Sequence, residues 1–160
     1  MKRILVVGYG NPHRADDGIG YRAALEYLAR NSDRGNVQVI AAETLKPDIV
    51  AEMSQANLVV FIDGSNCHGE PGSIWRQEIF SDETVDGVLA HPLTPPIALK
   101  ACHVIYHRAP EAILLCVKGE NYGFGSRVSP VVEATLPALM QRLDEIVLSA
   151  VNREAYACTV

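Results

Sequence analysis

Two aspartates and one histidine, far apart in the chain, are the residues best placed to do chemistry in this sequence. Asp17 lies in a polar loop after the apolar run at residues 4–7, and Asp63 directly follows another apolar run. His91 lies on a loop immediately before a proline-rich helix start. Two carboxylates and one imidazole can hold a divalent metal and leave coordination positions open to water or substrate. We therefore take Asp17, Asp63 and His91 as candidate catalytic and metal-binding residues.

The loop that carries Asp17 has two simpler interpretations. Gly8 and Gly10 begin like a dinucleotide-binding fingerprint, but His13 stands where that fingerprint requires its third glycine, so we reject this interpretation. An aspartate just before a helix often only caps it, and this is the role that we favour for Asp16. Asp17 is therefore the better functional candidate of the two.

The predicted elements bring these residues to one edge of a sheet, because the carboxyl ends of parallel strands meet there. Runs of branched apolar residues predict buried strands at residues 4–7, 58–62 and 112–117, and residues 37–41 predict a further strand. Residues 73–79 are less hydrophobic and predict an edge strand, which we expect to be antiparallel. Helical patterns and start signals predict helices at residues 17–30, 44–56 and 94–106, and a long closing helix capped by Ser129 and Pro130. The expected fold is α/β, a three-layer α/β/α arrangement whose twisted, mostly parallel sheet has about five strands and helices on both faces.

Composition limits the function classes that the chain could belong to. Its 160 residues, 48% of them hydrophobic and 21% charged, fit a single domain spanning residues 1–160. A net charge of −5 without any run of basic residues argues against a nucleic-acid partner. The sequence shows neither a secretory signal nor a long apolar segment, so we expect a cytoplasmic protein without a membrane partner. The four cysteines form no Cys-x-x-Cys pair, so we expect reduced, mostly structural thiols.

A phosphoacceptor receiver module is a competing interpretation of the same carboxylates. Such a module places two acidic residues after its first strand, an aspartate at the end of its third and a lysine after its fifth. Asp16 and Asp17, Asp63 and Lys118 imitate that order. The receiver's acidic pair follows the first strand directly, however, whereas residues 8–15 intervene here, and a receiver makes no use of His91.

A covalent hydrolase has weaker support from the sequence. Ser65 is close to Asp63 in the chain but lacks the Gly-x-Ser-x-Gly turn that exposes a nucleophilic serine. Cys67 and His68 are sequence neighbours, and adjacent side chains need not face each other. No side chain therefore stands out as a nucleophile.

A family resemblance combines several of these features. The segment GNPHRADDGIG, residues 10–20, resembles the Gly-Asn-x-x-x-x-Asp-(Asp/Glu)-Gly-x-Gly signature of the nickel-iron hydrogenase maturation endopeptidases. Residues 44–48 resemble a Leu-Thr-Pro-Glu-like segment of one branch, Asp63 the family's strand-ending aspartate, and His91 its histidine before a Leu-(Ser/Thr)-Pro turn. The resemblance extends to the last helix. The chain departs from the family at residues 41–44 and 89–90, which bears on substrate choice more than on activity.

The resemblance implies an endopeptidase that removes the C-terminal extension of a nickel-iron hydrogenase large-subunit precursor after nickel insertion. The family's metal-contacting positions correspond to Asp17, Asp63 and His91. The expected metal is nickel carried by the precursor, and other divalent metals could occupy the same site. We expect a monomer whose partner is the precursor. Two alternatives stay open: a receiver-like signalling module, and a non-catalytic metal-binding maturation chaperone that uses the same three residues.

Overall fold

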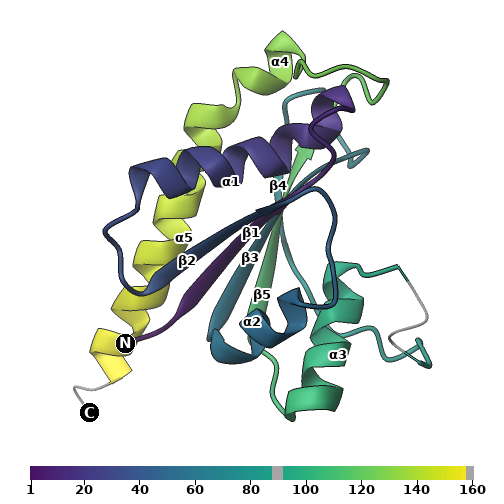
Figure 1. Ribbon diagram of the computed structural model, residues 1–160. Helices are drawn as coiled ribbons and strands as arrows, with labels where there is room; N and C mark the ends of the chain where they lie inside the picture. The colour runs from purple at the N-terminus through teal and green to yellow at the C-terminus, as the bar shows by residue number, and fades with distance from the viewer. Residues whose placement is uncertain (88–91, 158–160) are drawn as a thin grey trace.

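The computed structural model describes residues 1–87 and 92–157, and side chains up to residue 153. Five strands form one sheet in the order β2-β1-β3-β5-β4 (Figure 1). Four of them are parallel: β1 (Ile4–Tyr9), β2 (Val37–Ala42), β3 (Leu58–Ser65) and β5 (Glu111–Lys118). The fifth, β4 (Ile74–Glu78), pairs antiparallel with β5 at the edge of the sheet. The four parallel strands and the antiparallel edge strand predicted from the sequence are confirmed; β1, β3 and β5 are buried, whereas β2, at the opposite edge, is only half-buried.

Helices cover both faces of the sheet, so the predicted three-layer α/β/α arrangement is confirmed. The helices α1 (Ile19–Arg30) and α5 (Leu136–Ala157) lie over one face, and α2 (Ile49–Gln55) and α3 (Pro95–Tyr106) lie over the other (Figure 1). A short 3-10 helix, η1 (Ala15–Gly18), precedes α1. Among the described residues, no helix has the length and apolar character needed to cross a membrane.

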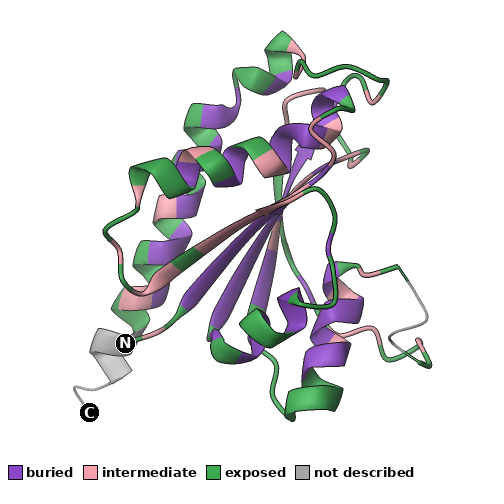
Figure 2. Cartoon of the chain, in the orientation of Figure 1, coloured by how far each residue is buried: buried purple, intermediate pink, exposed green. Residues whose placement is uncertain are grey.

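The two hydrophobic cores follow from the alternation of side chains along the strands. In β3, Val60 and Ile62 pack beneath α1 and α5, whereas Val59 and Phe61 pack beneath α2 and α3. All four are completely buried, and the central strands are buried along most of their length (Figure 2). Burial on both faces explains why these strands read as uninterrupted apolar runs rather than as alternating ones.

The closing helix is the one element whose predicted form is wrong. The chain forms a short helix, α4 (Pro130–Glu133), and then restarts as α5. Pro137 explains the interruption, because it has no N–H to donate to the carbonyl of Glu133. The predicted apolar stripe is nevertheless buried throughout: Val132, Leu136, Leu139, Leu143, Ile146 and Ala150.

The predicted capping of the closing helix by the side chain of Ser129 is also wrong, and Thr94 does not cap α3 either. Neither side chain makes a capping hydrogen bond, although α3 and α4 begin directly after them. Prolines follow both residues and reduce the number of free N–H groups in the first turn. The hydroxyl of Ser129 binds Asp16 instead.

Candidate functional site

The structure brings Asp17 and Asp63 together at the carboxyl edge of the sheet. Asp63 lies near the end of β3, and Asp17 lies in η1, at the end of the loop that follows the neighbouring strand β1. The pKa of Asp63 is raised to about 6, because burial and the negative charge of Asp17 raise it more than hydrogen bonds from Tyr9 and Gly64 lower it. Asp17 is thus close enough to Asp63 to influence its ionisation.

Tyr9, the last residue of β1, holds the carboxylate of Asp63. Its side chain is hydrogen-bonded to Asp63, and its ring lies edge-on against Phe61, with ring centroids 6.4 Å apart. Burial and the nearby carboxylates raise the pKa of Tyr9, so the phenol stays protonated and donates. The sequence analysis missed this residue. The feature that could have identified Tyr9 is the parallel register of β1 and β3. This register pairs Gly8 with Ile62 and so places Tyr9 beside Asp63.

Asp17 is held by its own loop. One of its carboxylate oxygens, Oδ2, accepts a hydrogen bond of 2.8 Å from the backbone N–H of Asn11. The side-chain oxygen of Asn11 in turn accepts from the N–H of His13 at 2.9 Å, which tightens the turn. Among the described residues, none donates a hydrogen bond to the Oδ1 atom of Asp17. That oxygen is therefore available to a ligand.

The predicted capping role of Asp16 is wrong, because its carboxylate points into the protein. Asp16 is completely buried and accepts hydrogen bonds from the backbone N–H groups of Glu120, Asn121 and Ser129, at 2.7–2.9 Å, and from the hydroxyl of Ser129. Burial raises the pKa of Asp16, but these hydrogen bonds outweigh it and the pKa is lowered overall. Asp16 is thus an ionised anchor between its loop and the loop after β5.

Backbone contacts reinforce this anchor. The N–H of Ala15 donates to the carbonyl of Gly125 at 2.8 Å. The N–H of Gly125 donates to the carbonyl of His13 at 2.9 Å. Ala15 has a φ of 48°, a left-handed conformation that is unfavourable for alanine. The surrounding contacts hold this strained turn, and the turn sends Asp16 inward and Asp17 toward the edge of the sheet.

Gly64 allows the loop to lie directly on β3. A methyl group at this position would overlap the carbonyl oxygen of Asp16 and would also meet the side chain of Ile19. Any side chain here would push η1 away from the strand that carries Asp63. The close approach of Asp17 to Asp63 therefore depends on a glycine beside Asp63 in the sequence.

His91 lies outside the described residues, so its place in the site stays a prediction. The other four histidines, His13, His68, His103 and His107, are all exposed. Within the described part of the chain, no three His, Cys, Asp or Glu side chains converge as a metal site. Asp17 and Asp63 alone would need further ligands, from elsewhere in the chain or from a substrate, to hold a metal ion.

The cysteine nearest the site is unsuited to nucleophilic attack. Cys116 lies opposite Asp63 in the register, and its sulfur is 2.8 Å from the hydroxyl oxygen of Ser65. Burial and a hydrogen bond with Cys67 raise the pKa of Cys116 to about 12. A thiol with this pKa stays protonated at neutral pH, whereas the thiolate is the reactive form. Cys67, Cys102 and Cys116 are free, as expected for reduced thiols.

The sheet topology argues against the receiver module. A receiver has the strand order 2-1-3-4-5, whereas here an antiparallel β4 lies outside β5. The ammonium group of Lys118, which a receiver would use to bind its phosphoryl group, is hydrogen-bonded here to the side chain of Asn66. The resemblance to a receiver is thus limited to the order of charged residues along the chain.

A hollow of about 500 Å³ lies beside this edge, where β2 ends between α1 and α2. Its lining includes Tyr21 from α1 and residues 40–46, which form the end of β2 and the following loop. The carbonyl of Ala42 accepts a hydrogen bond from the N–H of Gly10, at the start of the loop that carries Asp17. The hollow therefore adjoins that loop.

Replacing Asp63 with asparagine should stabilise the fold at neutral pH. The folded state raises the pKa of Asp63 from 3.8 to about 6, so ionisation costs stability as the pH rises through about 6. Asparagine cannot ionise and still offers an oxygen to Tyr9. We expect Asp63→Asn to raise the free energy of unfolding by about 1–2 kcal/mol above pH 7, with no gain below pH 3.8. Urea denaturation at both pH values measures this, and a gain independent of pH would contradict it.

Comparison with known proteins identifies the family. The family model described as hydrogenase maturation protease matches residues 23–146, a range that includes Asp63 and begins just after Asp17. The chain is similar to the solved structure of the nickel-iron hydrogenase maturation protease HycI from Thermococcus kodakarensis KOD1, with a TM-score of 0.73 and 23% identity over 91% of this chain and 92% of that one. No curated protein matches the chain.

Two further solved structures share the fold. One is the hydrogenase maturating endopeptidase HybD from E. coli, with a TM-score of 0.72 and 22% identity over 95% of this chain and 93% of that one. The other is a hydrogenase 2 maturation peptidase from a Thaumarchaeota archaeon, with a TM-score of 0.66 and 22% identity over 91% of this chain and 98% of that one. The family match extends over more than half of the chain, and the chain therefore belongs to the hydrogenase maturation proteases, a family of peptidases.

Proposed function

We propose that this protein is an endopeptidase that removes the C-terminal extension of a nickel-iron hydrogenase large-subunit precursor after nickel insertion, and that it recognises the nickel through Asp17, Asp63 and His91. The observation that carries the proposal is the convergence of Asp17 and Asp63 at one edge of the sheet, each with a carboxylate held by a neighbouring group. Family membership supports the peptidase activity.

In this proposal the metal belongs to the substrate. Two carboxylates supply too few ligands to hold a free divalent ion by themselves, but they suit an ion that arrives with part of its ligand set already in place. The precursor would supply those ligands, and Asp17 and Asp63 would add oxygen ligands with His91 as a nitrogen ligand. Binding then depends on nickel having been inserted, because an empty precursor offers these side chains nothing to coordinate.

Asp63 is also suited to proton transfer in peptide-bond hydrolysis. A general base works best when its pKa lies near the operating pH, and the pKa of Asp63 is about 6. Tyr9 fixes the carboxylate by donating to it, which leaves the remaining lone pairs for an attacking water. In this proposal the substrate metal polarises that water or the scissile carbonyl, and the precursor's terminal segment lies in the hollow at the end of β2.

The proposal is tested by incubating the protein with a nickel-loaded precursor and measuring the intact mass of the precursor. We expect the precursor to lose a C-terminal peptide, and we expect that peptide to be recovered in the same sample. The matched control is the same precursor truncated at its mature C-terminus, which should keep its mass. Stable binding of the nickel-loaded precursor without any loss of mass would instead support the non-catalytic chaperone and would reject the peptidase.

A further inference from the structure

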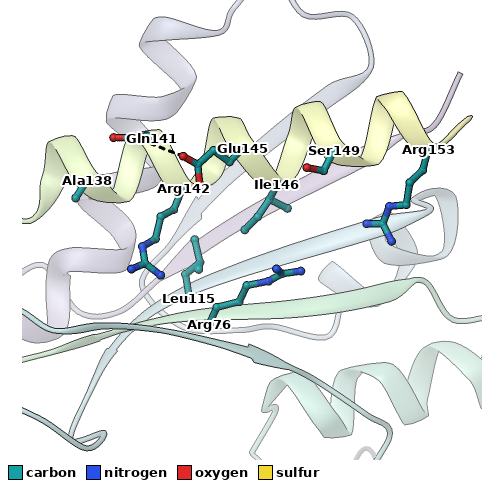
Figure 3. A pocket seen from close by; sticks show the side chains of 9 residues that line it. All are labelled: Arg76, Leu115, Ala138, Gln141, Arg142, Glu145, Ile146, Ser149 and Arg153. Atoms are coloured by element: carbon teal, nitrogen blue, oxygen red, sulfur yellow. Dashed lines mark hydrogen bonds between the residues drawn. The ribbon is translucent and has the colours of Figure 1, made fainter. Parts of the chain in front are cut away.

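A second hollow, of about 560 Å³, lies between α5 and the edge of the sheet formed by β4 and β5. Its walls carry three arginines: Arg76 from β4, and Arg142 and Arg153 from α5. Figure 3 shows the side chains of Arg76 and Arg142 reaching into the space between the helix and the strands. Ile146, which is 8% exposed, supplies the apolar part of the floor, beside the completely buried Leu115. We refer to this hollow as the arginine groove.

The arginine groove is a local concentration of positive charge in a chain whose net charge is −5. One acidic residue, Glu145, is among the lining residues, and its carboxylate accepts a hydrogen bond of 3.0 Å from Gln141. None of the three arginines forms an ion pair or hydrogen bond with another residue of the described chain. Unpaired like charges repel one another, so a bound anion would relieve the repulsion as well as form new contacts.

The spacing of the arginines decides the shape of that anion. Arg142 and Arg153 are eleven residues apart on α5, which places their Cα atoms about 16 Å apart along the helix axis. Figure 3 shows the three guanidinium groups spread along the groove rather than gathered at one point, so an extended anion matches them better than one phosphate or carboxylate does. An extended peptide advances about 3.3 Å per residue and alternate side chains share a face, so carboxylates about four or six residues apart would match the two arginines. Arg76, from the opposite wall, could then bind an acidic residue between them.

We infer that the arginine groove binds an extended acidic segment of a protein partner. Each guanidinium would take a carboxylate through paired N–H donors, and the apolar floor would accept an aliphatic side chain between the charges. Neither Asp17 nor Asp63 lines the groove. The inference therefore goes beyond the proposed peptidase activity and does not depend on it.

The test is fluorescence anisotropy with the full chain and a labelled peptide of ~12 residues with glutamate at every second position, so that the carboxylates share one face. The comparison peptide has glutamine in place of every glutamate. We expect saturable binding of the glutamate peptide at low salt, at least ~5-fold weaker binding of the glutamine peptide, and a loss of affinity as salt screens the charges.

Matched variants separate the groove from general charge attraction. Arg142→Gln combined with Arg153→Gln should weaken glutamate-peptide binding by ~5-fold or more, since each exposed charge pair contributes modestly. Arg3→Gln combined with Arg127→Gln makes the same change in net charge outside the groove and should leave binding within ~2-fold. Circular dichroism confirms that each variant is folded.

Three results would overturn the inference. The first is equal binding of the two peptides, and the second is an equal loss of affinity in the two double variants, since attraction would then follow net charge alone. The third is displacement of the peptide by inorganic phosphate at equimolar concentration, because the groove would then prefer a compact anion. None of these results bears on precursor cleavage, which is measured separately.

Discussion

Replacing Asp16 with alanine should lower the free energy of unfolding by about 3–5 kcal/mol, because it removes the charged acceptor of several buried hydrogen bonds. The substitution leaves three backbone N–H groups and the hydroxyl of Ser129 without their acceptor. Each of these donors was desolvated on folding and loses its partner. Urea denaturation at pH 7 measures the effect, and Ser129→Ala, which removes one donor, should cost about 1 kcal/mol.

The control for Asp16 is Asp33→Ala, which removes an exposed aspartate from the turn after α1. Its effect should stay within about 0.5 kcal/mol, as is usual for surface positions. An Asp16→Ala protein as stable as the Asp33→Ala protein would show that the carboxylate of Asp16 does not hold the two loops together.

The contribution of Asp16 should also depend on pH. Its pKa is lower in the folded protein than the ordinary value of 3.8, so folding favours the ionised form. The resulting stability is fully present above the ordinary pKa and is lost as the pH falls through the lower, folded-state value. The difference in stability between wild type and Asp16→Asn should therefore be constant near neutral pH and shrink only in strong acid. A difference that already shrinks between pH 7 and pH 5 would contradict the lowered pKa.

Replacing His91 with alanine should slow precursor processing by at least ~10-fold, the lower end of what losing even an outer partner costs a metal site. The expected reason is the loss of one of three proposed metal ligands, and the measurement is the initial rate of mass loss from nickel-loaded precursor. Only a neutral imidazole can coordinate a metal, so wild-type processing should also decline as the pH falls below about 6.5.

His13 provides the matched control for His91. It is exposed in the loop between β1 and η1, and its N–H rather than its ring supports the turn. His13→Ala should process the precursor at close to the wild-type rate. A folded His91→Ala protein with wild-type activity would reject the assignment, and an equal loss in His13→Ala would show that the other histidine is the ligand.

The sequence was sufficient to predict the features that depend on local pattern. Uninterrupted apolar runs predicted the buried strands, and the position of Asp63 at the end of one of them predicted its place at the carboxyl edge. The break before α5 could also have been predicted from the sequence, because Pro137 lies inside the helical pattern. A single long helix does not form because this proline has no N–H to donate to the preceding turn.

The roles of Asp16 and Tyr9 depend on contacts that no local pattern records. Asp16 binds donors more than a hundred residues later in the chain, at Glu120, Asn121 and Ser129. Nothing in the Asp16-Asp17 pair itself shows which carboxylate turns inward. Tyr9 acquires its role from the strand register, which is fixed only when β1 and β3 pair. Both roles therefore follow from tertiary structure.

Recognition of nickel in the substrate is the central claim, and comparing nickel-loaded with nickel-free precursor tests it most directly. Equal amounts of the two precursors are incubated with the wild-type protein, and the intact mass of each is followed over time. We predict that the nickel-loaded precursor loses its C-terminal peptide while the nickel-free precursor keeps its full mass over the same period. Cleavage of both precursors at the same rate would contradict the account, because Asp17 and Asp63 would then have no metal to recognise.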